Sequence, residues 1–278
     1  MMNATNSVMD KGVLVVAKED VAGCNIARYI INRFGFAKTG DTFDDMPTFR
    51  KGPLLLVWTS KELMHAEHLE GRFDNDFYVF LSKHQSERGI AALTAHTTGN
   101  FGNKTPLGGR PKEIAWTYPS LLKQYMKNLY KERDKVRSYQ VTTEATHHGP
   151  TSISKPLLFI EIGSTEKEWN DEEAVRIVSE TLMKTLSENI VNSKVAIAFG
   201  GGHYSSKFTE MLIGSDYTIA SMASKHVLQQ VDLFVTKQMI EKSVETVEYA
   251  IVDGKGLGSN REKILQLISS LGLNLIKV

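Results

Sequence analysis

The residues best suited to chemistry in this sequence are histidines in turn-like contexts, and the clearest is the adjacent pair His147-His148. The pair is followed by Gly149-Pro150, two residues that favour a turn. Adjacent histidines cannot both face a core, so at least one is expected to point into a loop or cleft. Because imidazole exchanges its proton near neutral pH, the pair could act in acid-base chemistry. A structural role fits this motif equally well when it is taken alone.

A carboxylate, Glu161, lies near the end of the apolar run 157–162, just before a turn at Gly163. Ligands of open α/β sheets gather at the carboxyl ends of strands. Glu161 is therefore a candidate base, or a candidate partner that orients a histidine. The alternative is a structural carboxylate that caps the turn.

Three consecutive glycines, 200–202, separate an apolar run from His203, Tyr204 and a predicted helix over 205–213. Glycines let a ligand approach the backbone, and their N–H groups can bind an anion or stabilise an oxyanion. The motif is neither GxGxxG nor a Walker loop, which argues against a nucleotide cofactor. The alternative is a tight turn that needs positive φ.

Two further histidines follow predicted strands. His96 ends a short strand that runs into a polar loop containing Gly99 and Asn100, and it could join the same site or simply be hydrogen-bonded at a strand end. His84 lies just past the run that ends at Leu81, where it could line a cleft.

The elements that must position these residues are short β-branched and aromatic runs that alternate with segments of helical periodicity. The runs predict buried strands near residues 13–16, 54–58, 77–81, 157–162, 195–199 and 249–252. Ile26, Ile30 and Phe34 form one helical stripe that ends at Gly35, and the acidic segment 171–173 opens another helix. The alternation predicts an α/β fold with a mixed, largely parallel sheet flanked by helices.

Several cations are candidates for contact with a polyanion. The predicted helix from Ser120 to Arg137 carries lysines at every fourth position, which would share one face: Lys123, Lys127, Lys131 and Lys135. That face could lie against phosphates, or it could simply be solvated. Lys104, Arg110 and Lys112 lie in or beside the glycine-rich loop 99–111, which we expect to be a flexible insertion.

Length and composition permit an α/β domain with a large core. The chain has 278 residues, 41% of them hydrophobic, and a formal net charge of +1. We expect residues 1–10 to form a flexible tail and residues 11–278 a single domain, with a soft subdivision near 139–146. The single cysteine, Cys24, excludes a disulfide framework and suits a reducing compartment, so we expect a cytoplasmic location. No segment approaches the roughly 18 apolar residues needed to cross a bilayer.

Several motifs, in the same order along the chain, resemble those of the archaeal and plant D-aminoacyl-tRNA deacylases. They are His-His-Gly-Pro-Thr at 147–151, Phe-Ile-Glu-Ile-Gly-Ser at 159–164 and Gly-Gly-Gly-His-Tyr at 200–204, with further similarity at 82–87, 93–102 and 252–257. The resemblance implies a monomeric α/β enzyme with a phosphorylase/hydrolase-like fold. It implies that the enzyme is zinc-dependent. It also implies the substrate, a tRNA that carries a D-amino acid on its terminal ribose.

For this reaction we expect His147 or His148, oriented by Glu161, to position or deprotonate water, directly or on zinc. The N–H groups of the glycine loop and of His203 would stabilise the oxyanion, and a rigid glycine wall would admit a D side chain where an L side chain collides. Zinc ligands are expected among His96, His148, Glu161 and His203, with the last three favoured. The candidates for substrate binding are His96, Gly99, Asn100, Lys104, Arg110, Gly200, Gly201, Gly202 and Tyr204.

Two other classes of function remain compatible with these residues. A zinc peptidase or a nucleoside phosphorylase-like enzyme could use the same fold and the same side chains. A non-catalytic tRNA-binding protein would use the lysines alone, and it predicts binding without turnover.

Overall fold

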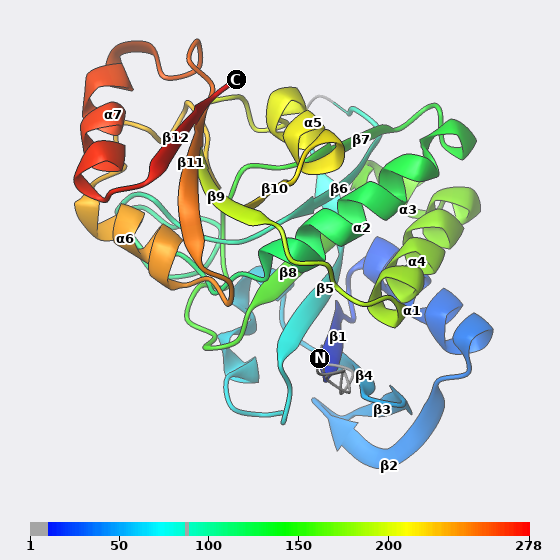
Figure 1. The fold of residues 1–278 in the computed structure, drawn as a ribbon. Coiled ribbons are helices and arrows are strands. Elements are labelled where there is room, and N and C mark those ends of the chain that lie inside the picture. The colour runs from blue at the N-terminus through cyan, green and yellow to red at the C-terminus, as the bar shows by residue number, and fades with distance from the viewer. Residues whose placement is uncertain (1–10, 87–88) are drawn as a thin grey trace, which may run out of the picture.

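The computed structural model describes residues 11–86 and 89–278, and the expected tail at 1–10 lies outside the described residues. An eight-stranded sheet forms the larger part of the molecule, in the order β2-β3-β4-β1-β5-β8-β6-β7 (Figure 1). Its strands are β1 (Gly12–Ala17), β2 (Ala37–Phe43), β3 (Met46–Lys51), β4 (Leu54–Thr59), β5 (Phe77–Gln85), β6 (Ala92–His96), β7 (Gln140–Thr143) and β8 (Leu157–Ser164). The four central strands β4, β1, β5 and β8 are parallel, whereas β2, β3 and β6 each pair antiparallel with a neighbour. The predicted mixed, largely parallel sheet is confirmed.

Helices cover one face of this sheet. They are α1 (Val21–Phe34), α2 (Pro119–Lys131), α3 (Glu166–Trp169) and α4 (Glu172–Ser187), and Figure 1 shows α1, α4 and α2 side by side. The α1 helix begins where the Asp20 carboxylate accepts a hydrogen bond from the Gly23 N–H, and it ends at Gly35 with a φ of 71°. Along β1, Leu14 packs toward the helices and Val15 toward the opposite face, so both faces are apolar, as the sequence predicted.

A second sheet of four parallel strands was not expected from the sequence. Its order is β10-β9-β11-β12, with β9 (Lys194–Phe199), β10 (Tyr217–Ala223), β11 (Val247–Val252) and β12 (Asn274–Lys277). The helices α5 (Ser206–Gly214), α6 (Leu233–Glu241) and α7 (Arg261–Ser270) belong to this part of the chain. The predicted strands at 195–199 and 249–252 and the predicted helix at 205–213 exist, but the two strands pair with each other in a separate sheet.

The segment that follows β7 connects the two sheets. Glu144 forms a β-bridge with Tyr204, and the Ala145 N–H donates to the His203 carbonyl oxygen at 2.9 Å. The Thr146 N–H donates to the Met222 carbonyl oxygen at 3.0 Å. The predicted subdivision at 139–146 thus includes β7 and this connecting segment, while the chain itself crosses to the second sheet between α4 and β9.

The prediction that four lysines share one helix face is wrong. The α2 helix ends at Lys131, and Lys135 lies in a following 3₁₀ turn, η2 (Arg133–Lys135). Lys123 is buried because its ammonium donates to the carbonyl oxygens of Ser215 and Tyr217, each at 2.6 Å. Lys127 and Lys131 remain exposed on α2, on the helix-covered side of the large sheet.

The opposite face of the large sheet is covered by a short 3₁₀ segment, η1 (Leu63–Leu69), and by irregular loops. Cys24 is buried on α1. Among the described residues there is no helix whose length and apolar character would let it traverse a lipid bilayer.

Candidate active site

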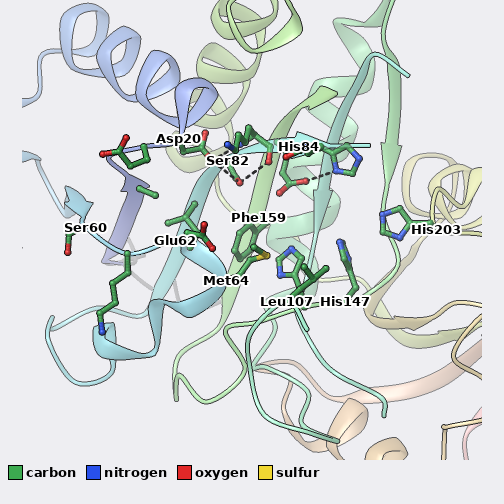
Figure 2. A pocket seen from close by; sticks show the side chains of 18 residues that line it. Asp20, Ser60, Glu62, Met64, Ser82, His84, Leu107, His147, Phe159 and His203 are labelled. Carbon is green, nitrogen blue, oxygen red and sulfur yellow. Dashed lines mark hydrogen bonds and ion pairs between the residues drawn. The ribbon is translucent and has the colours of Figure 1, made fainter. Parts of the chain in front are cut away.

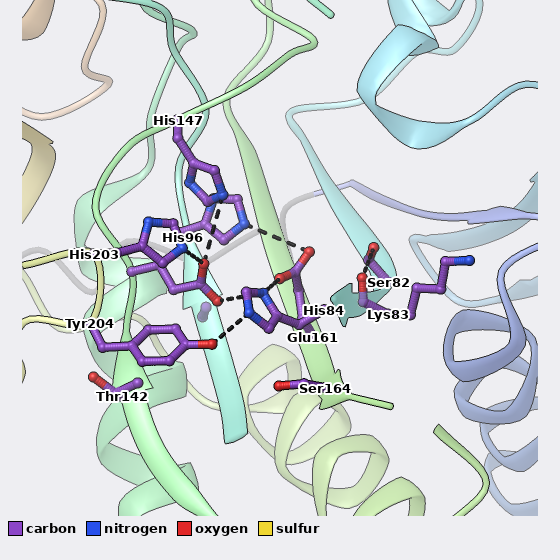
Figure 3. A network of polar contacts seen from close by, with 12 residues as sticks. Ser82, Lys83, His84, His96, Thr142, His147, Glu161, Ser164, His203 and Tyr204 are labelled. Atoms are coloured by element: carbon purple, nitrogen blue, oxygen red, sulfur yellow. Dashed lines mark hydrogen bonds and ion pairs between the residues drawn. The ribbon is translucent and has the colours of Figure 1, made fainter. Parts of the chain in front are cut away.

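Four histidines from distant segments meet on the loop-covered face of the large sheet, and Figure 3 shows three of them, His96, His147 and His203. His96 ends β6, His147 and His148 follow β7, and His203 precedes α5. The ring centroid of His147 lies 4.4 Å from that of His96, 4.3 Å from that of His148 and 4.6 Å from that of His203. The structure therefore brings the paired histidines and the histidine after the glycines into one cluster.

Three of these rings are held in a common way by the backbone. The Nδ1 atoms of His96, His147 and His148 lie within hydrogen-bonding distance of the carbonyl oxygens of Thr97, Ala145 and Gly149, at 3.2, 2.8 and 2.6 Å. A carbonyl can only accept, so each Nδ1 carries a proton, and in the neutral form of each ring Nε2 keeps a lone pair. The buried Nε2 of His96 has no hydrogen-bond partner among the described residues.

Burial sets the charge of the adjacent pair. It lowers the pKa of His147 well below its ordinary value and the pKa of His148 to about 3, and the neighbouring imidazoles add to both effects. Burial alone would also lower the pKa of His96, but the Glu161 carboxylate outweighs it and raises this pKa. His147 and His148 are therefore neutral near pH 7, which is the form that can bind a metal or accept a proton.

Glu144 is the central carboxylate of the site, and the sequence analysis missed it. It is 1% exposed. Its Oε2 lies 2.7 Å from His203 Nε2 and 3.7 Å from His147 Nε2, and its Oε1 lies 3.1 Å from His84 Nδ1. Burial opposes ionisation, but the surrounding imidazoles hold the pKa of Glu144 well below its ordinary value. Neither carboxylate oxygen has a donor aligned for a hydrogen bond among the described residues, despite these short distances.

Glu161 does not orient the adjacent histidines, which corrects the sequence-based assignment. Its Oε2 pairs with His84 Nδ1 at 3.1 Å, with hydrogen-bond geometry, and its Oε1 lies 3.7 Å from His96 Nε2. His84 is thus enclosed by two carboxylates, and its Nε2 contacts the Tyr204 hydroxyl. Burial would lower the pKa of His84, but Glu144 and Glu161 raise it to about 10. His84 is therefore a buried imidazolium at neutral pH.

The sequence does contain signals that point to Glu144 and His84. Glu144 is the only charged residue in the stretch 141–146, immediately before the paired histidines. His84 continues the alternation of Phe80 and Ser82 once β5 is extended to Gln85.

The cluster opens into a cavity of about 610 Å³ (Figure 2). Side chains of the site line its inner part: His84, His147, His148, Phe159, Glu161 and His203. His203 is the most open of these, with 44% of its side chain exposed. Water and a substrate can therefore reach the neutral imidazoles of His147 and His148 and the Glu161 carboxylate together.

The glycine loop lies outside the lining of this cavity, so the cavity gives no support to the predicted oxyanion site or chiral wall. Gly200 and Gly201 have φ values of 100° and 73°, so the loop is a turn that requires glycine. The Gly200 N–H donates to the Ala223 carbonyl oxygen at 2.9 Å and is not free for an anion. A Cβ on Gly256 would come within 2.4 Å of the Gly201 nitrogen, so the loop packs against the segment after β11. Gly200, Gly201 and Gly202 are not among the residues that line the cavity.

The other predicted binding residues lie outside the cavity as well. Gly99 supports the paired histidines, because its N–H lies 3.2 Å from the His147 carbonyl oxygen and 2.9 Å from that of His148. The Asn100 side chain donates to the carbonyl oxygens of Gly108 and Arg110, so it holds the loop 99–111 in shape. Lys104 and Arg110 are exposed and do not line the cavity.

Three groups of described residues offer ligand atoms that all lie within 4.8 Å of one another: His96, His147 and His148; Glu144, His147 and His203; and His84, Glu144 and Glu161. The favoured set from the resemblance, His148, Glu161 and His203, is not one of these groups. The first group presents three free Nε2 lone pairs whose opposite ring nitrogens are fixed by carbonyls, and this is how proteins prepare histidine ligands for zinc.

The arrangement suits hydrolysis. Neutral imidazoles can accept a proton, a buried carboxylate without aligned donors can hold water, and an adjacent cavity can admit a substrate carbonyl.

Comparisons with known proteins identify the family of this chain. Residues 72–276 match the family model described as D-aminoacyl-tRNA deacylase. The D-aminoacyl-tRNA deacylase of Cenarchaeum symbiosum is 35% identical over 267 residues, covering 95% of this chain and 98% of the relative. That of Pyrococcus furiosus is 35% identical over 272 residues, covering 95% and 99%. A crystal structure of a conserved protein of unknown function superposes with a TM-score of 0.89 at 28% identity, covering 96% of this chain and 95% of the other. The chain belongs to the D-aminoacyl-tRNA deacylase family.

Proposed function

We propose that this chain hydrolyses the ester bond between a D-amino acid and the terminal ribose of its tRNA, releasing the free D-amino acid and the tRNA. Family membership supports a hydrolase acting on D-aminoacyl-tRNA. The single observation that carries the ester chemistry is the pair of imidazoles, His147 and His203, that lie beside Glu144 at the inner end of the cavity.

An aminoacyl ester is already activated, so the chain must deliver water to the carbonyl carbon and protonate the departing ribose oxygen. His203 lines the cavity and accepts the proton of the attacking water. Glu144 lies 2.7 Å from His203 Nε2 and stabilises the resulting imidazolium. The same imidazolium then returns the proton to the ribose oxygen as the ester bond breaks.

The donor set also fits zinc. We propose that His96, His147 and His148 hold the ion, because their Nε2 atoms are free and their Nδ1 atoms are fixed. The unpartnered Nε2 of His96 and the unaligned oxygens of Glu144 support a missing electrophile at this place. When bound, zinc would polarise a carbonyl oxygen or lower the pKa of water.

We further propose that the enzyme works as a monomer in the cytoplasm. The tRNA substrate supports the cytoplasmic location.

The test compares deacylation of D-tyrosyl-tRNA and L-tyrosyl-tRNA by the wild-type protein and by His203→Gln, with Glu210→Gln on the exposed side of α5 as the control. We expect wild type and control to release D-tyrosine preferentially, and His203→Gln to lose roughly 100-fold or more in kcat. Equal hydrolysis of both esters, or an unimpaired His203→Gln, would contradict the proposal. Tight tRNA binding without turnover, cleavage of a peptide instead, or phosphate-dependent cleavage of a nucleoside would favour one of the alternatives.

A further inference from the structure

The cavity extends well beyond the histidine cluster. Its outer arm is lined by residues that directly follow or end three adjacent parallel strands: Glu19 and Asp20 after β1, Ser60, Lys61 and Glu62 after β4, and Ser82, Lys83 and Gln85 in β5. Figure 2 shows Ser60 and His203 at opposite sides of the cavity, with Phe159 and Met64 between them. The outer arm is therefore continuous with the histidine site within one cavity.

The size and position of this arm favour a nucleotide. Cavities of roughly 300 to 1,000 Å³ enclose most of a drug-sized ligand, and the whole cavity of about 610 Å³ has room for more than one amino acid. The carboxyl edge of parallel strands in an open α/β sheet is where such folds commonly bind nucleotides. Met64 and the half-exposed Leu107 supply an apolar surface between the two ends.

The outer arm also carries the cations of the cavity lining. Lys61 and Lys83 are the two lysines among the lining residues, and the lining contains no arginine. Within the described residues neither ammonium has a carboxylate oxygen within 4.0 Å, whereas Lys18 at the same edge pairs with Glu19 at 3.8 Å. The Lys83 ammonium lies 5.0 Å from the Trp169 ring centroid, which restrains it without neutralising it. Glu19, Asp20 and Glu62 line the same arm, so Lys61 and Lys83 are the two groups of its lining that could pair with an anionic part of a ligand.

The segment after β4 that carries Lys61 is held in place by hydrogen bonds to a neighbouring hairpin. In the hairpin between β2 and β3, the Asp44 carboxylate accepts hydrogen bonds from the Thr59 hydroxyl at 2.9 Å and from the Ser60 N–H at 3.0 Å. The backbone next to Lys61 is therefore fixed before a ligand binds, so binding there does not have to order a loose loop.

We propose that the outer arm binds the 3′-terminal nucleotide of the tRNA, with Lys61 and Lys83 holding its 5′-phosphate and with Met64 and Leu107 contacting the base. This inference rests on the proposed ester hydrolysis at the histidine cluster. It replaces Lys104, Arg110 and the lysines of α2 as the cations nearest to the reacting end of the tRNA.

The test uses two small esters that differ by one phosphate. They are 2′(3′)-O-D-tyrosyl-adenosine and the same ester of adenosine 5′-monophosphate, hydrolysed by the wild type, by Lys61→Gln, by the double variant Lys61→Gln/Lys83→Gln and by Lys127→Gln. Lys127→Gln is the matched control, because Lys127 is an exposed lysine on α2, which covers the opposite face of the sheet.

For the wild type and Lys127→Gln, we expect the phosphate to raise kcat/KM about 10-fold or more, mainly through KM, and this gain to shrink with added salt. In the double variant the gain, which is the ratio of kcat/KM for the two esters, should fall to about 2-fold or less, because neither glutamine carries the charge that binds the phosphate. Lys61→Gln alone, at an exposed position, should show an intermediate gain and guards against misfolding of the double variant.

The possible failures are distinguishable. If the wild type hydrolyses neither ester nor D-tyrosyl-tRNA, the proposed function is wrong. If it hydrolyses both esters at equal kcat/KM, or if the lysine variants keep the full phosphate gain, the nucleotide site is wrong and the proposed function stands.

Discussion

The stability of this fold should depend on pH through His84, the imidazolium enclosed by Glu144 and Glu161. The two carboxylates overcome burial and raise its pKa from 6.5 to about 10. At roughly 1.4 kcal/mol per pH unit, the difference between these values corresponds to about 5 kcal/mol of stabilisation. Because the pKa is higher in the folded than in the unfolded state, this contribution is fully present below pH 6.5 and is lost as the pH rises through about 10.

The variant Glu144→Gln separates this effect from other titrations. Oxygens of Glu144 and Glu161 lie equally close to His84 Nδ1, at 3.1 Å, so removing one charge should remove about half of the stabilisation, or about 2 to 3 kcal/mol. Glu144 itself stays ionised over this pH range and adds no slope. The free energy of unfolding should therefore fall less steeply with rising pH in the variant than in the wild type. The difference between their free energies of unfolding should narrow by about 2 to 3 kcal/mol between pH 6.5 and 10.

The assay is urea unfolding followed by circular dichroism at closely spaced pH values between 6.5 and 10, with a chelator present so that both proteins are free of metal. Glu210→Gln, the same chemical change at an exposed position, is the control and should follow the wild type. Parallel profiles of the wild type and Glu144→Gln would refute the enclosure of a charged His84.

Three more predictions concern the site and its support. Chelation should abolish most of the deacylation and added zinc should restore it, while His96→Ala should retain less zinc by elemental analysis; full activity in metal-free protein would remove zinc from the scheme. Tyr204→Phe should lower kcat about 10-fold or less, because it removes the hydrogen bond to His84 but leaves the aromatic ring in place, and a loss as large as that of His203→Gln would show that the hydroxyl acts on the substrate. Gly23→Ala should destabilise the fold by about 1 to 3 kcal/mol in urea unfolding, although alanine favours helices, because its Cβ would lie 2.2 Å from the Leu81 carbonyl oxygen; an unchanged midpoint would contradict this.

The central strands and first helices were predictable because their signals are local. The runs 13–16 and 54–58 are apolar on both faces, and the cap of α1 at Asp20 and its end at Gly35 lie next to the helix they bound. The division into two sheets was not predictable in this way. Strands β9 and β11 carry the same kind of apolar run as β1, and only their pairing with each other places them in the second sheet.

The lysine face failed for a related reason. Spacing of four residues does place Lys123 and Lys127 on one side of a helix, but it does not say what that side contacts. The carbonyl oxygens of Ser215 and Tyr217 accept hydrogen bonds from the Lys123 ammonium. Burial, together with the nearby charge of Lys127, lowers the pKa of Lys123 to about 8. A lysine that donates to the end of another helix is no longer available to a phosphate.

The partner of Glu161 depends on strand order, which the sequence does not contain. Glu161 lies opposite Ser82 of β5 on one side and opposite Thr94 of β6 on the other. The residues two positions further along each neighbouring strand, His84 and His96, share its face and lie diagonally beside it. The order β5-β8-β6 therefore fixes both of its histidine contacts. His147 and His148 follow a strand that is not adjacent to β8, and for this reason the nearest histidines in the sequence were not the ones that Glu161 contacts.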